Sequence, residues 1–164
     1  MYPLPTARSF KRSGFTVIEL LVVIVVLAIL ASVAIPNFGP TIANNRATTA
    51  ANEILGTLQF ARSEAVKLNQ TVIVRPSNTC DSTIPISDWE NGWVVCRGNT
   101  LIRLRQALHS TITVDNPNEI RFSSAGTTQG ANLDIEITVS GAASRRCIRV
   151  PLSGSARVIN GDCS

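Results

Sequence analysis

Gly-Phe-Thr-Val-Ile-Glu-Leu-Leu, at residues 14–21, opens an apolar run that continues to Phe38. The only charged side chain between Phe15 and Phe38 is Glu19. A helix needs about 20 apolar residues to cross the hydrocarbon core of a bilayer, and this run is long enough. The sequence therefore predicts a membrane-spanning helix over residues 15–38.

The residues before this run are basic. Arg8, Lys11 and Arg12 carry positive charge, and residues 1–14 contain no acidic side chain. The positive-inside rule then keeps this end in the cytoplasm and places the rest of the chain on the other side of the membrane. A cleaved secretory signal is the alternative, with small residues near 28–34 as its cut site. The length of the run and the presence of Glu19 favour a helix that is retained.

Glu19 is unusual in such a helix. A carboxylate at the centre of a membrane helix costs about 2.5–3.5 kcal/mol on insertion scales, and less near the helix end. Glu19 is the fifth residue from Phe15, so it lies near the end of the run. We expect it to gain from a cationic partner.

The basic segment is followed by Gly14, Phe15, a glutamate at the fifth position from Phe15, and a long apolar run. This combination resembles the processing site of type IV pilins and type II secretion pseudopilins. The resemblance implies a prepilin peptidase that cleaves after Gly14 and methylates the new N-terminus at Phe15. It assigns Glu19 to subunit assembly, and it assigns Pro36 to a helix kink. The other interpretation is a plain signal anchor that happens to contain a glutamate.

An amphipathic helix is predicted beyond Pro36, over residues 39–70. Apolar residues recur there at alternating spacings of four and three, which makes one stripe on a helix. The stripe consists of Ala47, Ala51, Ile54, Leu58, Ala61, Ala65 and Leu68. We expect this stripe to be the face that packs on a core, with polar residues such as Glu53 and Arg62 opposite.

The remaining residues, 71–164, predict short strands. Alternating apolar and polar residues are separated by turn signals such as Arg97-Gly98-Asn99. The candidate strands are 71–75, 92–97, 100–105, 110–115, 119–123, 133–139, 146–152 and 156–159. A helix followed by a run of strands predicts an α+β fold in which antiparallel β-sheet packs on the helical stripe. Four parts are thus expected: a cleaved leader (1–14), a membrane helix and fibre core (15–38), an amphipathic helix (39–70) and a β-rich periplasmic part (71–164).

All four cysteines lie beyond the membrane helix: Cys80, Cys96, Cys147 and Cys163. Four cysteines allow three pairings, of which joining near neighbours along the chain is the simplest. Disulfides fit an oxidising compartment such as a bacterial periplasm. A zinc site is less well supported, because no C-x-x-C occurs and the single histidine, His109, is remote in sequence.

The amphipathic helix and the following loop resemble the GspH/FimT group, and most closely its FimU/FimT branch. The similarity lies in residues 52–66, which contain A-R-S-E-A-V, and in the D-W-x-x-G-W pattern at 88–93. It implies a minor pilin in the inner membrane, and later in the fibre, that primes a type IV pilus or sits at its tip. Its partners would be other minor and major pilins. A minor pseudopilin of a type II secretion system is the alternative.

Motifs for catalysis are not found. The sequence has no G-x-S-x-G elbow, no H-E-x-x-H and no P-loop. Asp134 and Glu136 share one strand face, which we expect to be solvated. Trp89 and Trp93 are expected to brace the loop or the helix, and His109 to lie on the surface. We therefore predict a protein that is not an enzyme and has no metal or cofactor.

A basic cluster near the C-terminus suggests DNA as an alternative partner. Its members are Arg145, Arg146, Arg149 and Arg157. Such a patch neutralises phosphates without reading bases. Some FimT-like minor pilins take up DNA through a G-R-x-R pattern, but only Arg157 matches that pattern here. The other interpretation is a solvated strand face or a subunit interface. Net charge does not favour nucleic acid, because the chain without residues 1–14 has twelve basic residues against eleven acidic ones.

Overall fold

The computed structural model describes residues 14–34, 38–116, 119–130 and 133–163. It contains two compact units, Met1–Phe38 and Gly39–Ser164, which we describe separately. Most of the expected leader and Pro36 lie outside the described residues, so the predicted kink stays a prediction.

The first unit contains one helix, α1 (Val17–Ala34). Thr16 precedes it, and its hydroxyl oxygen accepts a hydrogen bond from the N–H of Glu19 at 3.3 Å. This is the N-terminal half of a capping box, in which Thr at the N-cap is followed three residues later by Glu. None of the helices formed by the described residues combines the length and the apolar character needed to cross a bilayer.

The second unit contains nearly all of a long helix, α2 (Phe38–Leu68). The predicted stripe from Ala47 to Ala65 is fully buried, and only Leu68, in the last turn, is partly exposed. Asn69 ends the helix with a φ of 51°. The N–H groups of Asn69 and Gln70 then donate to the carbonyls of Val66 and Ala65, which is a Schellman motif.

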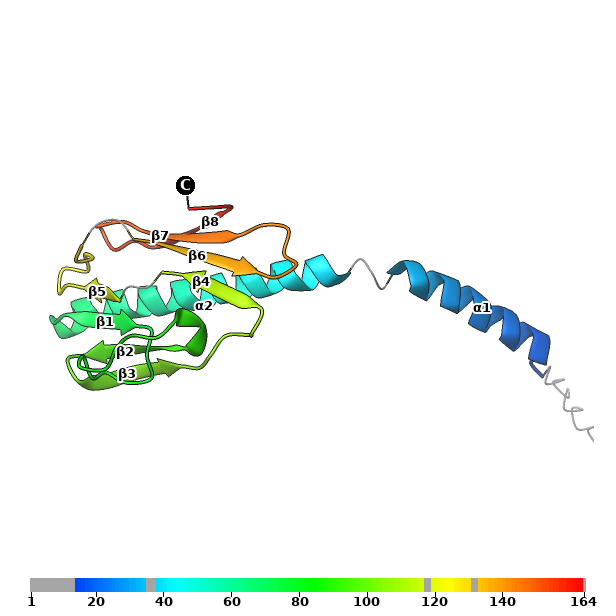
Figure 1. Ribbon diagram of the computed structural model, residues 1–164, viewed down its shortest axis with the longest axis horizontal. Helices are drawn as coiled ribbons and strands as arrows, with labels where there is room; N and C mark the ends of the chain where they lie inside the picture. The colour runs from blue at the N-terminus through cyan, green and yellow to red at the C-terminus, as the bar shows by residue number, and fades with distance from the viewer. Residues whose placement is uncertain (1–13, 35–37, 117–118, 131–132, 164) are drawn as a thin grey trace, which may run out of the picture. The chain divides into compact units, whose positions relative to one another are not determined.

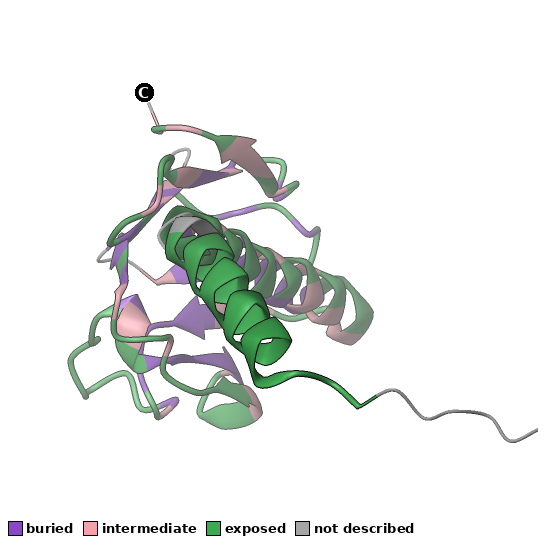
Figure 2. Ribbon diagram, turned by 90° about the vertical axis from the view of Figure 1, so that its right-hand side faces the viewer, coloured by how far each residue is buried: buried purple, intermediate pink, exposed green. Residues whose placement is uncertain are grey.

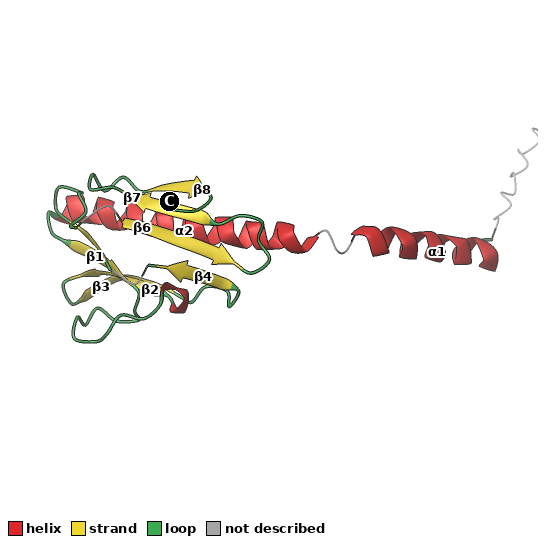
Figure 3. Ribbon diagram, turned by 45° about the horizontal axis from the view of Figure 1, so that its top comes forward, coloured by secondary structure: helices red, strands yellow, loops and turns green. Residues whose placement is uncertain are grey.

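The described residues after α2 form eight strands, all in antiparallel pairs. They are β1 (Val72–Arg75), β2 (Trp93–Arg97), β3 (Thr100–Arg105), β4 (Ile112–Asp115), β5 (Ile120–Phe122), β6 (Leu133–Val139), β7 (Arg146–Val150) and β8 (Arg157–Asn160). They form two four-stranded sheets, in the orders β3-β2-β1-β5 and β4-β6-β7-β8. Both sheets lie along α2 (Figures 1 and 3). The predicted α+β class is confirmed, with two sheets on the helix.

The core lies between α2 and the inner faces of the two sheets. Small residues on α2, such as Ala47 and Ala61, let the strands approach closely, and buried residues of both sheets belong to the same core cluster. Figure 2 colours parts of the strands beside α2 as buried. The short 3-10 helix η2 (Trp89–Asn91) adds Trp89 to this core beside Trp93, with ring centroids 5.8 Å apart. Both indoles are fully buried, so they brace the fold as the sequence suggested.

Two disulfides staple the second unit. Cys80 bonds to Cys96 and Cys147 to Cys163, with Cα atoms 5.7 and 5.2 Å apart. This is the simplest of the three pairings that the sequence allows. The first bond ties the loop after β1 to β2, and the second ties the C-terminus to β7. The chain-entropy model assigns about 3 kcal/mol to closing loops of this size.

Candidate assembly and binding surfaces

The helix α1 presents apolar side chains on all sides. Phe15 is 79% exposed and Val17 83%, and the large apolar residues from Ile18 to Leu30 are each close to half exposed or more. In Figure 2 the described part of this helix is coloured as exposed. A surface of this size is stable in water only when lipid or another protein covers it. It is therefore the first candidate interface.

Glu19 lies at the N-terminal end of this apolar surface. Its position in the first turn of α1 is favourable, because the helix dipole places partial positive charge there. Its backbone N–H is held by Thr16. The T-x-x-E spacing from Thr16 to Glu19 is the sequence signal for this cap. Glu19 thus has both a local structural role and a carboxylate that remains exposed.

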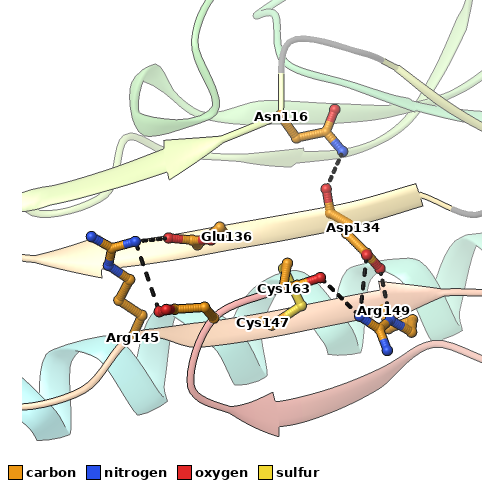
Figure 4. The surroundings of a disulfide bond; sticks show 8 residues. Asn116, Asp134, Glu136, Arg145, Cys147, Arg149 and Cys163 are labelled. Atoms are coloured by element: carbon orange, nitrogen blue, oxygen red, sulfur yellow. Dashed lines mark hydrogen bonds and ion pairs between the residues drawn. A yellow bond between two sulfur atoms is a disulfide. The ribbon is translucent and has the colours of Figure 1, made fainter.

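The C-terminal arginines divide into two pairs. Arg149 donates from Nε and Nη2 to the two carboxylate oxygens of Asp134, at 3.0 and 3.3 Å, and from Nη2 to the carbonyl of Cys163 at 2.9 Å. Arg145 Nη1 lies 2.7 Å from Glu136 Oε1 and 3.7 Å from Asp162 Oδ1. Figure 4 shows both arginines turned toward the carboxylates of β6 beside the disulfide. The charge of these two arginines is therefore locally compensated.

Arg146 and Arg157 have no carboxylate partner among the described residues. Arg146 donates instead to the hydroxyl oxygens of Ser144 and Thr48, at 2.7 and 3.3 Å. Arg157 is exposed on β8. Asp134 and Glu136 share one strand face, as expected, but that face is only partly solvated because the arginines cover it. The four arginines therefore present less free positive charge than the sequence suggests.

One group of potential metal ligands lies next to these arginines. Oxygen and sulfur atoms of Asp134, Cys147 and Cys163 lie within 4.8 Å of one another. Both sulfurs are joined in the disulfide. Zinc is bound by thiolate sulfur, so this group does not have the chemistry of a zinc site.

The loop after β1 is held by a buried arginine. Arg75 is only 5% exposed, and its guanidinium donates to the carbonyls of Asp81 and Ile84 at 2.7 and 2.9 Å. Within the loop, Asp81 accepts hydrogen bonds from the backbone N–H and the hydroxyl of Thr83, at 2.9 and 2.7 Å. These bonds, the backbone one first, lower the pKa of Asp81 from its ordinary value of 3.8. The loop is thus ordered from its base.

A pocket opens between α2 and the segment that joins β3 to β4. It has a volume of about 390 Å³, and Ile42, Glu53, Leu108 and His109 are among its lining residues. His109 is exposed, and its Nδ1 lies 3.1 Å from the hydroxyl of Thr111. His109 is thus a surface residue, as the sequence predicted.

Two family models match the chain. The model of the type II transport protein GspH matches residues 50–154, and the model of the prokaryotic N-terminal methylation motif matches residues 9–35. The second match covers Gly14, Phe15 and Glu19. No curated protein matches the sequence.

Solved structures share the fold. The crystal structure of the type IV minor pilin FimU from Pseudomonas aeruginosa PAO1 is 20% identical, with a TM-score of 0.59, and the match covers 73% of this chain and 92% of FimU. The minor pseudopilin EpsH from the type 2 secretion system of Vibrio cholerae is 14% identical, with a TM-score of 0.53, and the match covers 70% of this chain and 96% of EpsH. The family model covers more than half of the chain, so the chain belongs to the GspH family of type II transport proteins, the group of minor pilins and minor pseudopilins.

Proposed function

We propose that this chain is a minor pilin that primes the assembly of a type IV pilus or sits at its tip. The observation that carries the proposal is the exposed apolar surface of α1 with Glu19 at its N-terminal end. Such a helix is suited to a fibre core, where helices of neighbouring subunits cover one another. The second unit, stapled by two disulfides, then contacts the other minor and major pilins.

Glu19 acts in this proposal as an assembly signal. A carboxylate in an apolar surrounding is costly unless a positive charge lies beside it. The N-terminal amine of Phe15, or that of the preceding subunit, supplies this charge after removal of residues 1–14. A partner gained on assembly favours entry into the fibre and fixes the axial register of the subunit.

Processing and location follow from the same segment. We propose that a prepilin peptidase cleaves after Gly14 and methylates Phe15, with residues 15–38 in the inner membrane and the second unit in the periplasm. The match to the methylation motif over residues 9–35 supports this order of events. Pro36 is proposed to permit the helix to adjust its packing in the fibre.

Variants at Glu19 test the proposal. Glu19→Gln keeps the size of the side chain and removes its charge, so we expect few pili and little subunit in sheared fibres. Thr16→Ala is the matched control, because it removes the hydroxyl that accepts from the N–H of Glu19 and leaves the carboxylate in place. Normal pilus number and normal incorporation of the Glu19→Gln subunit would contradict the assembly role. An equal loss in both variants would show that assembly responds to the stability of the first turn of α1 and not specifically to the carboxylate of Glu19.

A minor pseudopilin of a type II secretion system is the alternative. The family name and the likeness to EpsH favour it. Deletion of the gene separates the two functions, because the pilin loses surface pili and the pseudopilin loses secretion of extracellular enzymes. The same Glu19→Gln variant then serves in either assay.

DNA binding is the second alternative, and Arg146 and Arg157 favour it. The test is binding of duplex DNA by the full chain in detergent at two salt concentrations. Contacts with phosphates predict affinity that falls steeply with salt. Binding that is lost in Arg146→Ala/Arg157→Ala would support uptake of DNA, and absence of binding at low salt would exclude it.

A further inference from the structure

The strand β3 is an open edge of its sheet. It pairs with β2 on one side and with no other strand among the described residues (Figure 1). Two other edges are protected. Glu90 accepts a hydrogen bond from the N–H of Val114 on β4 at 2.7 Å, and the turn after β5 folds back so that Gln129 donates to the carbonyl of Arg121 at 3.0 Å. An unprotected edge offers free N–H and C=O groups to another chain.

The side chains of β3 are both apolar and basic. Leu101 and Leu104 are 50% and 51% exposed. Arg103 and Arg105 lie on the same strand, and Arg97 lies at the facing end of β2. Residues 97–106 contain no aspartate or glutamate. The β2–β3 hairpin therefore carries three arginines, two of them on the edge strand β3, and two exposed leucines.

These positive charges have no carboxylate partner in the part of the chain that the structure describes. No ion pair of the described residues includes Arg97, Arg103 or Arg105, whereas Arg145 and Arg149 each have a carboxylate partner. Arg103 stacks on the ring of Phe60 of α2, with its guanidinium carbon 3.8 Å from the ring centroid. The structure thus locates an uncompensated basic surface at β3, a place that the sequence analysis did not single out.

We propose that the edge of β3 binds an extended, acidic segment of another protein by strand addition. Backbone hydrogen bonds would supply affinity, the arginines would select carboxylates, and the leucines would cover alternate apolar side chains. A second copy of this chain does not fit, because three arginines on each hairpin would repel. The register shift between Val95 and Cys96, where Ile102 bulges from β3, limits the paired length to a short segment. This inference does not depend on whether the fibre is a pilus or a pseudopilus.

The test uses the full chain in detergent micelles and a fluorescent octapeptide that alternates glutamate and valine. Anisotropy measures binding, and hydrogen exchange locates it. A second octapeptide alternates lysine and valine. We expect the acidic peptide to bind about tenfold more tightly than this basic peptide and to slow hydrogen exchange in β3. The same acidic peptide with N-methyl groups on alternate amides cannot form the strand pairs, and we expect it to lose about tenfold in affinity. Equal binding by the N-methylated peptide would overturn strand addition.

Two matched variants test the charges. Arg97→Gln/Arg105→Gln leaves the packed Arg103 in place, and we expect it to weaken binding of the acidic peptide by about tenfold. Arg146→Gln/Arg157→Gln removes the same charge elsewhere, and we expect it to change binding by less than about twofold. An equal loss in both would show that net charge alone attracts the peptide. If duplex DNA displaces the peptide and protects β3 from hydrogen exchange more strongly than the peptide does, the protein partner is wrong and the edge binds nucleic acid.

Discussion

Trp93 and Thr57 join the first sheet to the long helix through a buried hydrogen bond. The indole Nε1 of Trp93 on β2 donates to Oγ1 of Thr57 on α2 at 3.2 Å, and Thr57 in turn donates to the carbonyl of Glu53 at 2.9 Å. Both residues are at most 1% exposed. The polar atom of a large aromatic side chain is thus satisfied inside an apolar core.

Thr57→Val keeps the shape of the side chain and leaves the indole N–H without an acceptor. An unsatisfied buried donor costs about 1–3 kcal/mol, so we expect the free energy of unfolding to fall by that amount. Urea denaturation followed by tryptophan fluorescence measures it. Thr49→Val on the exposed side of α2 is the control, with a change within about 0.5 kcal/mol. Equal effects would mean that the buried bond contributes nothing.

Gly154→Ala is expected to destabilise the contact between two turns. Gly154 has a φ of 75°, and a β-carbon there would overlap the carbonyl oxygen of Gly126, which also accepts from Arg62 Nε at 2.8 Å. Gly98→Ala is the control, because Gly98 has a φ of 54° but open space around it. Left-handed geometry costs each variant about 1–2 kcal/mol, and we expect the clash to cost Gly154→Ala about 1–3 kcal/mol more. Thermal unfolding measures the melting temperatures of the two variants. Similar values would show that the backbone at Gly154 shifts at little cost to avoid the clash.

Among the described residues, Asp134→Asn/Glu136→Gln is expected to leave Arg149 without a carboxylate partner and Arg145 with Asp162 alone, 3.7 Å away. Both ion pairs are partly exposed, so each loss should cost less than about 1 kcal/mol of stability. Affinity for duplex DNA at low salt should rise, with up to about two more counterions released. Glu53→Gln/Asp115→Asn removes the same charge from other exposed sites and serves as the control. An equal rise in the control variant would indicate net charge alone.

Asp81 is expected to titrate below its ordinary pKa of 3.8, because hydrogen bonds from Thr83 favour its charged form. The folded-state pKa lies below the unfolded one. The stabilising contribution is therefore fully present above the unfolded value and is lost as pH falls through the folded value. Carboxyl-carbon NMR titration measures the pKa. Thr83→Val removes the hydroxyl bond and should move the pKa of Asp81 part of the way back. An unchanged pKa in that variant would contradict the assigned cause.

Local sequence signals predicted the secondary structure closely. The stripe from Ala47 to Ala65 identified the buried face of α2. The alternation of apolar and polar residues over 133–139 predicted the same bounds for β6 that the structure shows. These features depend on periodicity and on turn residues, which act over a few neighbouring positions.

Local patterns did not reveal which distant side chains meet. Arg62 was expected on the polar face of α2, yet it is half buried and donates to the carbonyls of Gly126 and Ser153. The arginines after Ser144 form one basic cluster in the sequence, but two of them pair with carboxylates of β6. Their partners are defined by strand register, which the sequence of either strand alone does not specify.

The sequence by itself determined the family, the match to the N-terminal methylation motif, the order of helices and strands, and the positions of the cysteines. Tertiary structure alone decided that the strands form two sheets, with β5 beside β1 and β4 beside β6. It also decided which arginines have their charge compensated by a nearby carboxylate. The arginines of β3 have no such partner among the described residues. The physical reason is that helices, turns and strands follow from contacts between near neighbours, whereas sheet order and charge compensation depend on residues brought together from far along the chain.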